Sequence, residues 1–265
     1  MAKAHYHFGD LRRSGEELNH AAALCRSDKN DLQLAHVELT RLGLFLGVNP
    51  LEATFASLPG LRRLVAHVGA PHLMVELRLC VARAEARCHA LDNAREHLSV
   101  AEAMLESYPN LWLQGLLLLD RSNVDGLVGN LSASFESAEH ARRLALQSGH
   151  VRTRVAATIN ISHILCASGK FDKALAYVAE GLQAAGSNFH LRLAALDSRA
   201  NVLLSSHKLV DCRSVFSEIA SLAAGLSGNR LHWDKLTELF SHARLAQAES
   251  NWADAIEFLT AGIEL

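Results

Sequence analysis

Fifteen histidines and five cysteines are the side chains of this sequence that could bind a metal ion or act as a nucleophile. A zinc site needs several such side chains at close spacing, and a nucleophilic cysteine needs a histidine and an orienting acid beside it. The histidines are dispersed along the chain, His36 and Glu38 do not share a helix face, and no C-x-x-C pair occurs. No phosphate-binding glycine loop is present either. We therefore expect a protein that is not an enzyme and that uses no metal or cofactor.

The composition argues against several other classes of function. The net charge of −2 gives no sign of the positively charged surface that binds nucleic acid. We therefore expect no direct contact with nucleic acid, RNA included. The longest apolar stretch, residues 111–119, contains Gln114 and is too short to span a bilayer, so we expect no membrane partner. The odd number of cysteines, several of them at apolar helix positions, indicates reduced thiols and a cytoplasmic protein.

The elements that must position any binding residues are helices, and they repeat. With 49% hydrophobic residues, four prolines and no alternating strand pattern, the chain is predicted to be all-α. A helix, a short polar break and a second helix recur in CVARAEARCHALDNAREHLSVAE at 80–102, NISHILCASGKFDKALAYVAEGL at 160–182 and SHARLAQAESNWADAIEFLTAGI at 241–263. A recurring helix pair is typical of a solenoid, whose units pack only on their neighbours.

Clusters of Gly, Pro, Asn and Ser mark the unit boundaries, because these residues end one helix and admit the next. We predict about six helix pairs in one array over residues 32–265, with units near 32–72, 73–110, 111–150, 151–188, 189–230 and 231–265. Residues 1–31 are predicted to supply a capping helix, at Gly15–Arg26.

Small residues recur where the two helices of each pair should cross, since a larger side chain there would push the helices apart. The first helices carry Ala82, Gly126, Ser162, Ala200 and Ala243 at this position. The second helices carry Ala53, Ala94, Ala138, Ala174, Cys212 and Ala255. This pattern resembles the tetratricopeptide repeat (TPR), and the resemblance implies a right-handed α-α superhelix, a TPR-like solenoid.

Two features depart from the family pattern. The units are longer than the usual repeat of about 34 residues, and the first unit has Arg41 where a small residue is expected. Longer units of this kind resemble the helical arrays of bacterial signal-transducing transcription regulators.

The first helix of each unit lines the concave face of such a solenoid, so its exposed positions form the groove that holds a partner. The predicted groove residues are Glu76, Arg83, Asn123, Asn160, His163, Asp197, Asn201, Phe240 and Arg244. Asn160 and Asn201 are of special interest, because a side-chain amide can hold a peptide backbone through a donor and an acceptor. None of these positions is Lys, unlike the paired Lys and Arg of the co-chaperone members, which hold a terminal carboxylate.

The last predicted helix carries Phe258, Leu259, Ile263 and Leu265 at core-like spacing, with no polar cap after them. A solenoid normally covers its terminal unit with a polar helix. We therefore expect either that the sequence is a segment of a longer polypeptide or that this end is buried in a homodimer.

Together these features predict a non-catalytic scaffold that binds a protein or peptide, or senses a ligand. The family resemblance implies the regulatory part of a larger bacterial transcription regulator or signalling protein. Two alternatives stay open: a receptor for a short signalling peptide held by Asn160 and Asn201, and an accessory α-solenoid of an enzyme.

Overall fold

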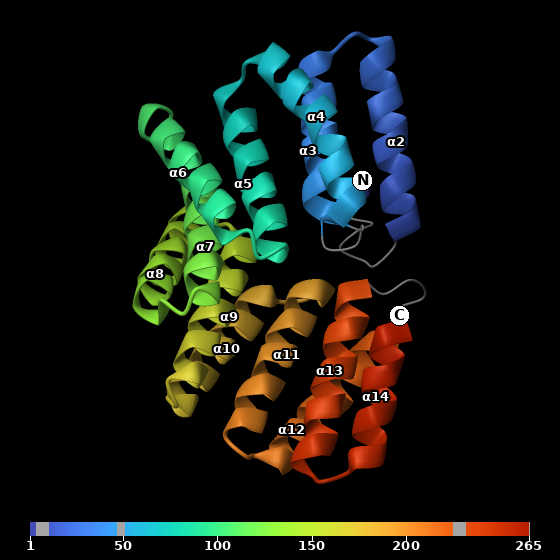
Figure 1. Cartoon of the computed structure of the whole chain (residues 1–265), viewed down its shortest axis with the longest axis vertical. Coiled ribbons are helices and arrows are strands. Elements are labelled where there is room, and N and C mark those ends of the chain that lie inside the picture. The colour runs from blue at the N-terminus through green and yellow to red at the C-terminus, as the bar shows by residue number, and fades with distance from the viewer. Residues whose placement is uncertain (4–10, 47–50, 225–231, 265) are drawn as a thin grey trace. The chain divides into compact units, whose positions relative to one another are not determined.

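The computed structural model of the chain is helical (Figure 1). It describes residues 1–3, 11–46, 51–224 and 232–264, and these ranges contain thirteen long helices and no strand. The helices are α2 (Leu11–Ser27), α3 (Asp31–Phe45), α4 (Leu51–Val68), α5 (Pro71–Arg87), α6 (Leu91–Ser107), α7 (Leu111–Leu127), α8 (Leu131–Ser148), α9 (Val151–Ala167), α10 (Phe171–Ala185), α11 (Phe189–Ser205), α12 (Leu209–Ala224), α13 (His232–Ala248) and α14 (Trp252–Glu264).

The helices pack as two compact units, one holding Leu11–Thr153 and the other Arg154–Leu265. The first unit contains α2–α8, and the second contains nearly all of α9 together with α10–α14. Neighbours along the chain pack against each other, as α5 does against α6, α7 against α8 and α13 against α14. Alternate helices also touch, as α5 touches α7 and α11 touches α13. The first helices of successive pairs within a unit therefore lie side by side.

Asparagine side chains begin several of the helices. Asn30, Asn110, Asn130 and Asn188 each accept a hydrogen bond from the backbone N–H three residues later, at 3.0–3.3 Å. These bonds satisfy a donor that the first helical turn otherwise leaves unpaired. Gly169 takes a φ of 70° between α9 and α10, the left-handed conformation that commonly ends a helix. Local chemistry thus sets the ends of these helices.

The predicted crossing residues are buried in most of the helix pairs. The buried ones are Ala82, Ser162, Ala200 and Ala243 on first helices, and Ala94, Ala138, Ala174, Cys212 and Ala255 on second helices. In the pair α11–α12, the Cys212 Sγ lies 3.6 Å from the backbone oxygen of Ala200. In the pair α7–α8, a Cβ atom added at Gly126 would lie 3.3 Å from Ser134 Oγ. Close approach at small residues is therefore confirmed for these pairs.

The same prediction is wrong for the pair α3–α4. Ala53 of α4 is exposed, and the half-buried Arg41 of α3 stands where the other first helices carry a small residue. An arginine side chain is too large for a close crossing. A cavity lies between the two helices, and both residues line it.

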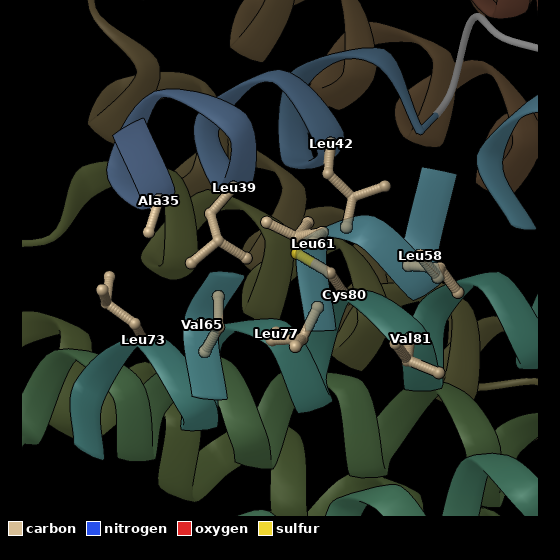
Figure 2. Close-up of a cluster of buried hydrophobic side chains, with 10 residues drawn as sticks. All are labelled: Ala35, Leu39, Leu42, Leu58, Leu61, Val65, Leu73, Leu77, Cys80 and Val81. Atoms are coloured by element: carbon tan, nitrogen blue, oxygen red, sulfur yellow. The ribbon is translucent and has the colours of Figure 1, made fainter. Parts of the chain in front are cut away.

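Leucine, valine and alanine side chains fill the space between the helices. In α3, α4 and α5 one cluster consists of Ala35, Leu39, Leu42, Leu58, Leu61, Val65, Leu73, Leu77, Cys80 and Val81 (Figure 2). Cys80 lies inside it as a small hydrophobe, as its position in the sequence predicts. A second cluster joins α5, α6 and α7, and a third joins α11, α12 and α13. Full burial of each leucine or valine contributes about 1.5–3 kcal/mol to folding.

Candidate functional site

Three first helices of the second unit, α9, α11 and α13, carry most of the predicted groove residues. Ser162 of α9 and Ser198 of α11 are buried, and their Oγ atoms hydrogen bond at 2.8 Å. Ser241 of α13 donates from its Oγ to Asp197 Oδ1 of α11, also at 2.8 Å. These bonds tie each helix to the next. We call the surface formed by Asn160, His163, Asp197, Asn201, Phe240 and Arg244 the α9–α11–α13 face.

Asp197, Asn201 and Arg244 form a hydrogen-bonded chain on this face. Asn201 Nδ2 donates to the Asp197 carboxylate at 3.1 Å and to the Asp197 backbone oxygen at 3.0 Å. The Asn201 Oδ1 atom accepts a hydrogen bond from Arg244 Nη1. Arg244 is exposed, whereas Asp197 and Asn201 are half-buried. The chain of bonds therefore joins a carboxylate, an amide and a guanidinium group that solvent can reach.

His163 belongs to the same face. Its side chain is exposed, yet desolvation by the surrounding protein lowers its pKa, and the positive charge of Arg244 lowers that pKa further. The influence of Arg244 shows that a residue of α13 lies close enough to act on one of α9. Because its pKa lies below the ordinary value of 6.5, His163 is mainly a neutral imidazole at pH 7, which can both donate and accept a hydrogen bond.

The two asparagines that the sequence indicated are held in different ways. Asn160 is half-buried and takes part in interactions within the chain. Asn201 uses its amide nitrogen towards Asp197 and its amide oxygen towards Arg244. A peptide backbone that binds Asn201 through both groups must therefore displace part of this arrangement. Phe240, one turn before Arg244, is exposed and offers an apolar surface beside the polar groups.

The predicted groove residues of the first compact unit, α2–α8, are arranged differently. Arg83 Nε of α5 donates to both carboxylate oxygens of Asp120 of α7, at 2.8 and 2.9 Å. Asp120 is only 4% exposed; burial raises its pKa, and the charge of Arg83 opposes that rise. The ion pair ties α5 to α7, so Arg83 has a structural task that the sequence did not reveal. Glu76 is half-buried two turns before Arg83, and Asn123 of α7 is exposed.

Two of the five cysteines, Cys80 and Cys212, are buried. Burial raises the pKa of the Cys80 thiol to about 11 and that of Cys212 to about 11, so the reactive thiolate is scarce at neutral pH. Among the residues that the structure describes, no group of three or more His, Cys, Asp or Glu side chains could hold a metal ion. His36 of α3 and His72 of α5 form a pair, with Nε2 atoms 3.4 Å apart.

In the described ranges, no helix is both long enough and apolar enough to cross a membrane.

No family model and no curated protein matches the sequence. Among solved structures, a Rap protein complexed with competence and sporulation factor matches with a TM-score of 0.74 at 17% identity, over 94% of this chain and 72% of that chain. NprR in complex with its cognate peptide NprX matches with a TM-score of 0.66 at 13% identity, over 96% of this chain and 72% of that chain. The chain has a TPR-like helical-repeat fold. BtubC from P. vanneervenii matches with a TM-score of 0.60 at 13% identity, over 81% of this chain and 88% of that chain.

Several side-chain contacts of this TPR-like chain join residues about one repeat apart. Ser162 and Ser198 are 36 residues apart, and Trp112 donates its indole N–H to His150, 38 residues later. Ser241, which the sequence did not single out, lies 44 residues after its partner Asp197. Comparing equivalent positions of successive units is the sequence signal that would have found these pairs.

Proposed function

We propose that this chain is a non-catalytic scaffold that binds a short peptide across the α9–α11–α13 face. The observation that carries the proposal is the bonded series from Ser241 through Asp197 and Asn201 to Arg244, which sets polar groups on adjacent first helices within reach of solvent. The likeness in fold to a Rap protein and to NprR, each solved with a bound partner, supports the same function.

The chemistry of the face suits an extended peptide. Every residue of such a peptide presents an unpaired N–H and C=O, and side-chain amides and carboxylates can match both. Asn160, Asp197 and Asn201 supply these groups. Arg244 adds a guanidinium for a carboxylate of the peptide, and the exposed ring of Phe240 adds an apolar contact.

In the cell, this binding would serve regulation. We assign the chain to the regulatory part of a larger bacterial transcription regulator or signalling protein in the cytoplasm, where the bound peptide or protein alters the activity of the whole. The TPR-like fold and the two peptide- or factor-bound structural neighbours support this assignment.

Peptide selection followed by calorimetry tests the proposal. Short random peptides displayed on phage are selected on the whole chain, and the Kd of the best peptide is measured by titration. Asn201→Ala and Arg244→Ala should each weaken binding about tenfold, which is the loss expected for one strong polar contact. Asn93→Ala, at an exposed asparagine of α6, is the matched control and should leave the Kd unchanged. Equal affinity in the wild type and both face variants would contradict the proposal.

Exposed apolar residues on α14 support a second proposal, that two copies of the chain associate through this helix. Ile256, Leu259 and Ile263 follow one another at helical spacing and are exposed, Ile263 to 85%. Leu265, which belongs to the same sequence pattern, lies outside the described residues. Light scattering over a range of concentrations should show a dimer for the wild type and a monomer for Ile263→Glu. A wild-type chain that stays monomeric throughout would refute the association.

A further inference from the structure

A cavity of about 320 Å³ lies in the first unit, between α3, α4 and the end of α2. Its volume is at the lower end of the range found for small-molecule sites. None of the predicted groove residues lines it, so it shares no residue with the α9–α11–α13 face.

The cavity occurs where the repeat pattern fails. In the other helix pairs a small residue on the first helix lets the second helix approach closely. In α3 that place is taken by Arg41, and the opposing Ala53 is exposed and lines the cavity with it. Arg41, which stands where the repeat pattern has a small residue, therefore leaves an open space between α3 and α4 in place of a packed helix crossing.

The inner wall of the cavity is apolar. It is formed by Leu34, Leu42, Leu46, Leu61 and Leu64, with Phe45 beside them. The first four leucines keep 7–9% of their surface exposed, whereas Leu39, Leu58 and Val65 of the adjoining core keep only 1–4%. Leu42 and Leu61 belong both to the cavity lining and to the buried cluster of α3, α4 and α5. Figure 2 shows Leu42 of α3 reaching towards Leu61 of α4. The first four leucines on the cavity side are thus buried, but slightly more exposed than those of the adjoining core.

Charged and polar groups converge on the same cavity. Glu38 accepts hydrogen bonds from Arg26 Nη2 and Arg41 Nε, both at 3.0 Å. Arg41 Nη1 also donates to Asn19 Oδ1 at 2.8 Å, which fixes the guanidinium plane. Each guanidinium carries five N–H donors, more than these bonds use. Two guanidinium groups face one carboxylate, so the polar side of the lining has an excess of positive charge.

We propose that this cavity binds a small amphipathic carboxylate, with its apolar chain against the leucine wall and its carboxylate on Arg41 and Arg26. The excess positive charge selects an anion, and planar guanidinium groups suit the two oxygens of a carboxylate. The Ser57 hydroxyl, which donates to the Thr54 backbone oxygen at 2.7 Å, adds a polar group at the cavity. The site does not depend on peptide binding elsewhere in the chain.

Titration of the whole chain with decanoate tests the proposal, with decan-1-ol and decylamine as probes of equal length and different charge. Decanoate should bind saturably with one site per chain, decan-1-ol about tenfold more weakly, and decylamine not measurably. Equal binding of decanoate and decylamine, or no saturable binding of decanoate, would overturn the proposal.

Two variants locate the site. Arg41→Ala should weaken decanoate binding about tenfold by removing a charged hydrogen bond. Gly60→Phe should abolish binding by filling the cavity; a Cβ there meets no atom within 4 Å, so the fold should tolerate the change. Arg63→Ala, at an exposed arginine of α4 outside the lining, is the control and should bind like the wild type. Wild-type affinity in Gly60→Phe, with its fold intact by circular dichroism, would refute the assignment.

Discussion

Arg244 on α13 donates a hydrogen bond to the side-chain amide oxygen of Asn201 on α11, 43 residues earlier in the chain. This bond fixes which way the amide points, because the nitrogen is then left to face Asp197 one turn earlier. The pair therefore holds Asn201 and Arg244 in one arrangement, part of which a peptide must displace if it is to bind both groups of the Asn201 amide.

Removal of Arg244 should change the titration of His163. The positive charge of Arg244 is one of the two causes that lower the pKa of this histidine, so Arg244→Ala should raise that pKa towards 6.5. The measurement is the pH dependence of the His163 imidazole signals in NMR spectra. Arg199→Ala, at an exposed arginine of α11, should leave the titration unchanged. An unaltered His163 pKa in Arg244→Ala would show that the two side chains do not share a face.

The ion pair of the first unit should matter for stability. Arg83→Met leaves the buried Asp120 carboxylate without its partner, which should lower the free energy of unfolding by about 3 kcal/mol. The double variant Arg83→Met/Asp120→Leu should recover most of this loss, since no buried charge remains. Urea unfolding at neutral pH measures all three proteins.

The control for this prediction is a more exposed pair between α6 and α7. Arg121 bonds Glu102 at 2.7 and 2.9 Å, but the glutamate side chain is 45% exposed. Arg121→Met should therefore cost less than about 1 kcal/mol. Similar losses from Arg83→Met and Arg121→Met would mean that the burial of Asp120 has no energetic effect.

Equivalent alanines in two helix pairs should respond differently to the same enlargement. Ala174 of α10 is fully buried at its crossing, so Ala174→Leu should destabilise the fold by about 1–3 kcal/mol through overpacking. Ala53 of α4 is exposed, so Ala53→Leu should change stability by less than about 0.5 kcal/mol. Thermal or urea unfolding compares the two variants. A larger loss for Ala53→Leu would contradict the open crossing of α3 and α4.

Stability should fall on acidification, partly through His150. Trp112 Nε1 donates to His150 Nε2 at 2.9 Å, and an indole can only donate, so this nitrogen must be unprotonated. Burial lowers the pKa of His150 below its ordinary value of 6.5, and the charge of Arg152 adds to the effect. As the pH falls through 6.5 the unfolded chain takes up the proton first, so the free energy of unfolding drops. It stops dropping once the pH is below the folded pKa.

The measurement is urea unfolding at about pH 7.5 and about pH 5.5. His150→Gln keeps a hydrogen-bond acceptor but does not titrate, so its stability should fall less between the two conditions than that of the wild type. His20→Gln, at an exposed histidine of α2, serves as the control and should show the wild-type difference. The prediction fails if His150→Gln shows that same difference.

Much of the architecture followed from local sequence chemistry. The sequence predicted a short polar break within residues 160–182, and Gly169 lies at that break, between α9 and α10. The contact between Ala200 and Cys212 shows that the predicted small residues do meet. The reason is physical: turn residues and crossing residues act within one helix pair, so their effect is visible in a short stretch of sequence. The prediction that Ala53 lies at a close helix crossing was wrong, because the environment of Ala53 depends on Arg41 of the opposite helix.

The candidate site was less predictable than the fold. Its positions follow from the helical period, which is why residues such as Asn201 and Arg244 fall on one face. Their partners do not follow from that period. Arg83 forms an ion pair with Asp120, and Ser241 hydrogen bonds to Asp197. Each pair comes together only when successive helix pairs pack against each other. Side-chain contacts between successive helix pairs depend on the tertiary structure, and so does the cavity at Arg41.

Hydrogen–deuterium exchange of the whole chain, with and without a peptide selected on it, tests the central claim most directly. If the α9–α11–α13 face binds the peptide, protection should concentrate in backbone amides of α9, α11 and α13. Protection confined to the second helices α10, α12 and α14, or to the first unit alone, would contradict the account.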